Sequence, residues 1–277
     1  MTVEPEDVAL VERTRAAMLV DAAAHEREEV ARVEDVDAGG VPTRIYRAAN
    51  PQRTLFFLHG GGFVYGEPDT HDAFARRLAN ATESVLVFPH YRRAPQDRFP
   101  AAWHDTRTAW EWAKSQQFPG QRVLIGDSAG ANLALGLAVE DPRSHDALVL
   151  VYPFLDPRGT SYDVGKDNPD LGLETMSWFW RMYADEGTWL DPRVDPLLER
   201  TYAALPRTLM QLASDDVLVT TGERLAQRMR TDGVDVTLTT YPDVPHGFWR
   251  HEEYAESHAA VSQIAAFLPS ALAWAVP

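Results

Sequence analysis

Short apolar runs rich in β-branched residues recur along this chain, and segments of helical periodicity lie between most of them. Runs of this kind, bounded by turn residues, are typical of buried strands. We predict eight strands, over residues 29–38, 43–48, 54–58, 85–89, 122–125, 147–152, 208–213 and 236–241. We predict helices over residues 71–80, 101–116, 131–139, 222–231 and 254–274. Strands that alternate with helices favour an α/β fold with a mostly parallel eight-stranded sheet, flanked by helices on both faces.

Two segments depart from this alternation. Charged and apolar residues follow each other at helical spacing over about 6–28, which predicts a pair of amphipathic helices with little core of their own. Gly39 and Gly40 separate the first two predicted strands and indicate a hairpin. The segment over about 153–206 is rich in Pro, Gly and Asp and holds one compact aromatic helix over 177–183. We interpret this segment as an insertion over the sheet, in a chain of 277 residues that forms one domain.

A strand, a tight turn and a helix meet at Gly126-Asp127-Ser128-Ala129-Gly130. A serine between two glycines, each two positions away, is the pattern of a nucleophile elbow. The turn would push the serine clear of the sheet, and the helix behind it would direct its free N–H groups at the site. The glycines are needed where a Cβ would collide with the turn or with neighbouring strands. Alone, the pattern fits a small-residue connection without chemistry equally well.

Reactive side chains also follow other predicted strands, and the carboxyl ends of parallel strands are where such sheets collect catalytic groups. A serine, an acid and a histidine follow three strands in that order along the chain, which is the order of the α/β-hydrolases. His246 differs from the other histidines because prolines restrict its loop and Gly247 follows it.

The acid lies in the loop after strand 208–213, where two aspartates are adjacent. Thr220 and the residues after it match a capping box, which predicts that the next helix begins there with Thr220 as its N-cap. Residues 214–219 would then form the loop, and either Asp215 or Asp216 could face the histidine.

Three glycines, Gly60, Gly61 and Gly62, follow His59 at the end of strand 54–58. A phosphate-binding loop is disfavoured because neither G-x-x-x-x-G-K-[ST] nor a helix-opening G-x-G-x-x-G is present. An oxyanion hole is favoured because glycines let bare N–H groups approach a developing negative charge.

Composition and charge narrow the classes of function. The net charge of −15 disfavours nucleic acid and anionic membranes as partners, and the absence of cysteine excludes disulfides and thiol catalysis. No apolar run reaches the ~20 residues of a membrane span, and residues 1–7 do not resemble a signal peptide, so we expect a soluble cytoplasmic protein. No third ligand accompanies His71 and Asp72 or His104 and Asp105 at a useful spacing, so we expect no metal.

Taken together, the motifs resemble the bacterial hormone-sensitive-lipase-like esterases, a branch of the α/β-hydrolases. The resemblance covers roughly residues 30–268. The matching segments are His59–Val64, Asp69–Asp72, Tyr91–Pro95, Phe99–Ala102, Gly126–Gly130, Trp178–Trp180, Asp195–Leu198, Asp216–Leu218 and His246–Phe248. The chain departs from residues usual in the family at His90, Gln96, Ala131 and Val217.

The resemblance implies a serine carboxylester hydrolase that works through an acyl-enzyme and needs no cofactor. Ser128 would be the nucleophile, His246 the base and Asp216 the acid. The oxyanion hole would be made by the N–H groups of Gly61, Gly62 and Ala129. The same machinery on the same scaffold could instead serve an amidase or arylformamidase. A non-catalytic binding protein, such as the plant gibberellin receptors that resemble this family but lack the histidine, is disfavoured because His246 is present.

The resemblance also implies a helical cap, formed by about residues 1–28 and 153–206, over the acyl pocket. Bulky residues near it are candidates for substrate binding: Phe63, Tyr65, Trp178, Phe179 and Phe248. Such residues would close a short apolar pocket, so we expect small-molecule esters with short to medium acyl chains as substrates. The resemblance allows a homodimer through the last strand and helix.

Overall fold

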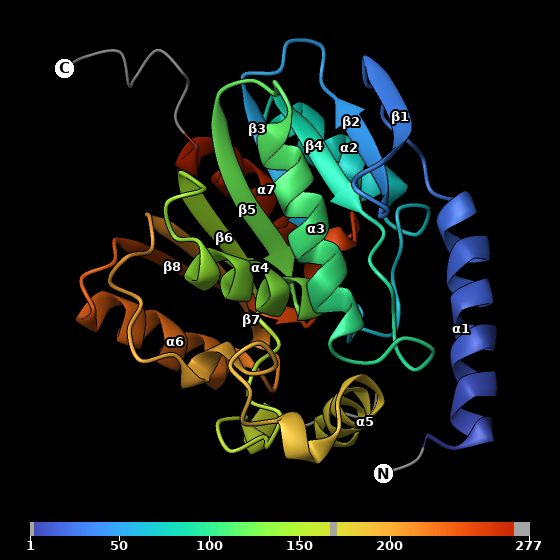
Figure 1. The fold of residues 1–277 in the computed structure, drawn as a ribbon, viewed down its shortest axis with the longest axis vertical. Coiled ribbons are helices and arrows are strands. Elements are labelled where there is room, and N and C mark those ends of the chain that lie inside the picture. The colour runs from blue at the N-terminus through green and yellow to red at the C-terminus, as the bar shows by residue number, and fades with distance from the viewer. Residues whose placement is uncertain (1–2, 167–170, 269–277) are drawn as a thin grey trace.

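The computed structural model describes residues 3–166 and 171–268 (Figure 1). Within these residues eight strands form one sheet in the order β1-β2-β4-β3-β5-β6-β7-β8. The strands are β1 (Arg32–Asp37), β2 (Pro42–Arg47), β3 (Arg53–Leu58), β4 (Ser84–Pro89), β5 (Gln121–Asp127), β6 (Ala147–Val151), β7 (Thr208–Asp215) and β8 (Val236–Pro245). The pairs β1–β2 and β2–β4 are antiparallel, and the other neighbouring pairs are parallel. The predicted mostly parallel sheet is therefore confirmed.

The helices cover both faces of this sheet. They are α1 (Pro5–Ala23), α2 (Asp72–Ala81), α3 (Ala101–Ser115), α4 (Ala129–Glu140), α5 (Leu173–Tyr183), α6 (Val219–Thr231) and α7 (Ala255–Phe267). Helices α3, α4 and α6 share one hydrophobic core with the sheet, and α2 and α7 share the other. Successive residues of β3 point to opposite cores, Phe56 to the first and Phe57 to the second. Because both faces of the central strands are buried, these strands are apolar runs rather than alternating ones.

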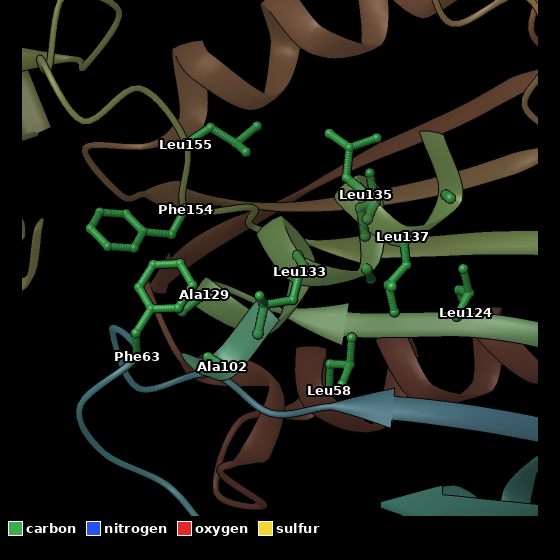
Figure 2. Packing of buried hydrophobic residues seen from close by; sticks show 14 of the residues in the cluster. Leu58, Phe63, Ala102, Leu124, Ala129, Leu133, Leu135, Leu137, Phe154 and Leu155 are labelled. Carbon is green, nitrogen blue, oxygen red and sulfur yellow. The ribbon is translucent and has the colours of Figure 1, made fainter. Parts of the chain in front are cut away.

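Helix α4 is apolar around its whole circumference because it lies between the sheet and other helices. Ten of its twelve residues are buried. Figure 2 shows Leu133 and Leu137 of α4 against Leu58 of β3 and Leu124 of β5. This packing holds the start of α4 directly behind the carboxyl end of β5.

The first helical segment is a single helix, and the predicted pair over about 6–28 was wrong. Helix α1 begins with Pro5 in its first turn, where the missing N–H of proline is no loss. Neither glycine nor proline occurs between residues 6 and 38 to form a turn between two helices. The buried residues of α1 are Val11 and Ala22, so this helix has little core of its own, as predicted.

The predicted capping box before α6 was also wrong. Helix α6 begins at Val219, and no side chain caps it. Asp216 organises the start instead: its Oδ1 accepts the N–H of Leu218 at 2.9 Å, and its carbonyl accepts that of Val219 at 3.1 Å. The hydroxyl of Thr221 donates to the carbonyl of Ser161. The predicted last helix ends at residue 267, and the final part of its predicted range lies in 269–277, outside the described residues.

The insertion between β6 and β7 carries α5, which lies beyond the carboxyl ends of the central strands in Figure 1. The described part of the insertion also holds three short 3-10 helices, η1 (Val164–Lys166), η2 (Glu186–Thr188) and η3 (Pro196–Leu198). Trp180 of α5 stacks on Phe154 with the ring centroids 4.3 Å apart. Trp178 Nε1 donates to Asp7 Oδ1 of α1 at 2.9 Å. Helices α1 and α5 are thus joined to each other, and their action as a cap stays a prediction.

Two carboxyl groups are buried at the base of the insertion. Asp195 is 1% exposed, and its Oδ1 accepts the N–H groups of Asp156 and Leu197. Asp156 is 2% exposed, and its Oδ2 accepts hydrogen bonds from Thr160 and Ser161. Burial, and secondarily the nearby Asp156, raises the pKa of Asp195 to about 6. The charged form of Asp195 is therefore disfavoured in the folded protein.

We predict that Asp195→Asn stabilises the protein at pH 8 but not at pH 4. A carboxyl whose pKa is higher in the folded state favours folding most when protonated, so this contribution is lost as pH rises from about 4 to about 6. Asn keeps the acceptor without the charge, and the gain at pH 8 should be about 2–3 kcal/mol. Urea unfolding at both pH values measures it. The exposed control Asp235→Asn should change stability equally at both, and a pH-independent effect of Asp195→Asn would contradict the prediction.

Candidate active site

Ser128 occupies a strained turn between β5 and α4. Its φ of +52° and ψ of −118° lie in a region that residues with a side chain rarely adopt. The surrounding backbone holds this conformation. The N–H of Ser128 donates to the carbonyl of Val151, and its own carbonyl accepts the N–H groups of Ala131 and Phe154 at 3.0 Å each. The turn directs the serine side chain beyond the end of β5, as the elbow pattern predicts.

The flanking glycines are required by close backbone contacts. A Cβ on Gly130 would lie 1.9 Å from the carbonyl oxygen of Leu58 at the end of β3. A Cβ on Gly126 would lie 2.3 Å from the carbonyl oxygen of Gly130. A side chain at either position would therefore collide with a neighbouring strand or with the turn, as the sequence predicts.

A chain of two hydrogen bonds joins the serine, the histidine and one aspartate. His246 Nε2 lies 2.9 Å from Ser128 Oγ, and His246 Nδ1 lies 2.6 Å from Asp216 Oδ2. Because a carboxylate oxygen accepts, Nδ1 carries the proton and Nε2 accepts from the serine hydroxyl. The side chains of Asp216 and His246 are only 1% and 8% exposed. The ring of Tyr152 lies 4.5 Å from the imidazole, centroid to centroid, and restricts its movement.

The structure distinguishes the two adjacent aspartates. Asp216 is buried and contacts His246, whereas Asp215 is exposed. Asp215 Oδ1 lies 3.2 Å from Lys166 Nζ, on the outside of the loop. The residues alone left this choice open, and the hydrogen-bond geometry favours Asp216.

The glycine loop presents free N–H groups to the same place. The N–H of Gly60 donates to Asp127 Oδ1 at 2.8 Å. In the part of the chain that the structure describes, the N–H groups of Gly61, Gly62 and Ala129 have no acceptor. Gly61 and Gly62 have φ values of +112° and +62°, and these values favour glycine. The three N–H groups are therefore free to bind an oxygen atom of a ligand.

A cavity of about 260 Å³ lies in front of Ser128. Its walls come from α1, the glycine loop, the insertion and the loop after β8. The larger of the residues on them are Met18, Tyr65, Phe154, Leu171, Met176, Phe179, His246, Arg250 and His251. A second cavity, of about 450 Å³, lies beside β1 and β2, and none of Ser128, Asp216 and His246 lines it. The small cavity is therefore the candidate site.

Of the five residues predicted to bind substrate, the structure places Tyr65 and Phe179 on the cavity wall. The other three do not line the cavity. Phe63 is fully buried and stacks on a tyrosine of α5, Trp178 is hydrogen-bonded to α1, and Phe248 packs behind Tyr152.

Sequence reasoning missed several wall residues, among them Met18 and Phe154. These come from separate segments, and no local pattern marks them. Met176, three positions before Phe179 on α5, was recoverable because that spacing puts both residues on one face of a helix.

In the described residues, no helix is long and apolar enough to cross a membrane. The same residues contain no group of three His, Cys, Asp or Glu side chains that could hold a metal ion. His71 and Asp72, whose spacing in the sequence lacks a third metal ligand, have other partners. His71 Nδ1 bonds to Thr70 and to the carbonyl of Glu67, and Asp72 accepts from Tyr46.

Comparison with known proteins identifies the family of this chain. A family model described as the α/β-hydrolase fold matches residues 55–250. The chain belongs to the α/β-hydrolase family. With the motifs above, this match confirms the predicted fold and the predicted hormone-sensitive-lipase-like branch.

Two relatives of this α/β-hydrolase are named as ester hydrolases. The chain is 33% identical to the ethyl acetate hydrolase of Pseudomonas putida, over 77% of this chain and 73% of that one. It is 32% identical to the carboxylic ester hydrolase LipN of Mycobacterium tuberculosis, over 76% of this chain and 61% of that one. The solved structure of an esterase from Pyrobaculum calidifontis is 33% identical, with a TM-score of 0.83 over 92% of each chain.

We predict that Gly130→Ala damages both stability and activity. The added Cβ has only 1.9 Å to the carbonyl of Leu58, so α4 must move away from β3, at a cost of about 2 kcal/mol or more. The same movement displaces Ser128 from His246. Thermal unfolding and ester hydrolysis measure the two effects. The control Gly187→Ala, whose Cβ would meet nothing within 4 Å, should leave activity unchanged, and full activity in Gly130→Ala would contradict the close contact.

Proposed function

We propose that this α/β-hydrolase is a serine carboxylesterase that cleaves small-molecule esters with Ser128 as its nucleophile. The hydrogen-bond chain from Asp216 through His246 to Ser128 is the observation that carries the proposal. It ends at a cavity beside three free N–H groups. The names of the relatives, ethyl acetate hydrolase and carboxylic ester hydrolase, support ester bonds as the target.

In the proposed reaction Ser128 Oγ attacks the ester carbonyl while His246 Nε2 takes its proton. Asp216 keeps the imidazole in the correct tautomer and stabilises the imidazolium that forms. His246 then gives the proton to the departing alcohol, and an acyl-enzyme remains. Water, activated by the same imidazole, releases the acid and restores the serine.

The negative charge that develops on the carbonyl oxygen needs donors that are already in place. The N–H groups of Gly61, Gly62 and Ala129 are the candidates, because the N–H of Gly60 is used by Asp127. Ala129 also lies at the start of α4, where the helix dipole favours negative charge. Donors of this kind, held in position before the reaction, supply a large part of the catalysis.

The alternative of an amidase or arylformamidase uses the same groups, and the ester names of the relatives disfavour it. A non-catalytic binding protein would not need the intact hydrogen-bond chain at His246. A homodimer through β8, which lies at one edge of the sheet, and a cytoplasmic location stay predictions.

We predict that Ser128→Ala lowers turnover of p-nitrophenyl butyrate by about 10⁴-fold or more, because the nucleophile is lost. Adding His246→Ala should cost little further, since groups that act as one unit are not additive. The exposed Ser262→Ala is the matched control and should keep full activity. Full activity in Ser128→Ala would overturn the proposed function.

The two aspartates give a second prediction. Asp216→Asn should lower turnover by about 10³-fold or more, because the imidazole loses its orienting carboxylate. Asp215→Asn should cost less than about tenfold, since Asp215 is exposed and its contact is with Lys166. Steady-state kinetics of both variants, with circular dichroism to verify folding, decide between them. The reverse order of effects would assign the role to Asp215.

The cavity predicts a preference for short to medium acyl chains. Each methylene that fits should add up to ~0.8 kcal/mol of binding, and activity should fall once about 260 Å³ is filled. A p-nitrophenyl ester series from acetate to palmitate measures this. Phe179→Ala should move the maximum to longer chains, whereas Trp178→Ala should not, because Trp178 does not line the cavity. A maximum at palmitate in the unaltered protein would contradict a closed pocket.

A further inference from the structure

Arg250 lies at the wall of the candidate site without an assigned role. It ends the 3-10 helix η4 (Phe248–Arg250), four residues after His246, and lines the cavity in front of Ser128. Its side chain is 24% exposed, and its Nε lies 3.8 Å from Asp127 Oδ2. Within the described residues this buried Nε has no hydrogen-bond acceptor. The contact between Arg250 and Asp127 is therefore an attraction between opposite charges and not a hydrogen bond of Nε.

Asp127, the partner of Arg250, ties the glycine loop to the end of β5. Its side chain is 2% exposed, and its Oδ1 accepts the N–H of Gly60 at 2.8 Å. Gly60 precedes the two glycines whose free N–H groups face the cavity. A buried carboxylate is unfavourable unless a cation balances it. Burial raises the pKa of Asp127, and Arg250 is the largest influence that opposes this rise.

The other ionisable groups near Asp127 do not supply a permanent positive charge. They are His246 after β8, Tyr91 after β4 and Tyr152 after β6. Burial raises the pKa of both tyrosines well above the usual value, so they stay neutral. His246 is hydrogen-bonded to Asp216 through Nδ1 and is the proton acceptor of the proposed reaction, so its charge is not a permanent one. Among the described residues, Arg250 is therefore the permanent cation that most lowers the pKa of Asp127.

Two buried imidazoles lie in the field of the same guanidinium. Nδ1 of His59 donates to the carbonyl of Gly60 at 2.8 Å, and Nδ1 of His71 donates to that of Glu67 at 3.2 Å. Their Nε2 atoms are thus acceptors, and neither has a partner in the described part of the chain. Burial lowers the pKa of both histidines, and the charges of Arg93 and Arg250 lower it further, so both stay neutral. Neutral acceptors around Arg250 are compatible with its charge.

We propose that Arg250 is a positioning residue: its positive charge keeps Asp127 as the carboxylate that holds the N–H of Gly60, and so keeps Gly61 and Gly62 directed at the cavity. This inference rests on the proposed function, because a fixed glycine loop matters for a reaction that passes through an oxyanion. Without the cation, Asp127 takes up a proton more readily and the loop loosens. The rate of the chemical step then falls more than the affinity for substrate.

The test is the kcat and KM of Arg250→Met for p-nitrophenyl butyrate between pH 5 and pH 9. Methionine keeps an apolar stem and removes the charge. We expect kcat at pH 7 to fall about tenfold with KM changed less than about twofold, and the acidic limb of the kcat profile to move to higher pH. Arg250→Lys should recover most of the rate. Arg107→Met, at an exposed arginine on α3, is the matched control.

The Asp127→Asn background makes the test specific. Asn keeps an acceptor for Gly60 and has no charge to balance, so adding Arg250→Met should then change kcat less than about twofold. An equal loss in both backgrounds, an unchanged pH profile, or a loss confined to KM would overturn the proposal. Thermal unfolding verifies that each variant folds, and Arg250→Gln replaces Arg250→Met if it does not. An inactive Ser128→Ala with an unaffected Arg250→Met would overturn this inference alone, whereas an active Ser128→Ala would overturn the proposed function.

Discussion

The close approach of α4 to the end of β3 is the constraint on which the rest of the site depends. Only the absence of a side chain at Gly130 lets the helix begin this near to the carbonyl of Leu58. Ser128, two residues before Gly130, has a positive φ and is held by hydrogen bonds to Val151 and Phe154. The contact at Gly130 also brings the start of α4 beside the glycine loop, which leaves β3 at the next residue. This backbone contact therefore brings the nucleophile and the free N–H groups close together.

The remaining groups reach this point through the order of the strands. In the sheet, β7 and β8 lie beyond β5 and β6, on the side away from β3. Asp216 and His246 follow their carboxyl ends and lie within hydrogen-bond distance of each other. Burial at this edge strengthens the hydrogen bonds and makes each unpaired charge unfavourable. Two buried carboxylates at the site accordingly have partners: His246 for Asp216, and Arg250 with the N–H of Gly60 for Asp127.

The sheet and the elbow were predictable from the sequence because buried strands and close backbone contacts leave local signals, such as the apolar runs and Gly130. The start of α6 was not, because Asp216 takes the place of the expected Thr220 cap: its Oδ1 binds the N–H of Leu218 while its Oδ2 binds His246. The choice between two adjacent aspartates depends on which way the loop faces. The cavity wall was predictable only in part, since Met18 joins it through tertiary packing of α1.

The most direct test of the account is covalent labelling of the purified protein with a fluorophosphonate, read by mass spectrometry of its peptides. Such a reagent phosphonylates a serine whose hydroxyl is activated by a neighbouring base. The account predicts one label per chain, on Ser128, with labelling abolished in Ser128→Ala and strongly slowed in His246→Ala. A label on another serine, or a rate that does not depend on His246, would contradict it.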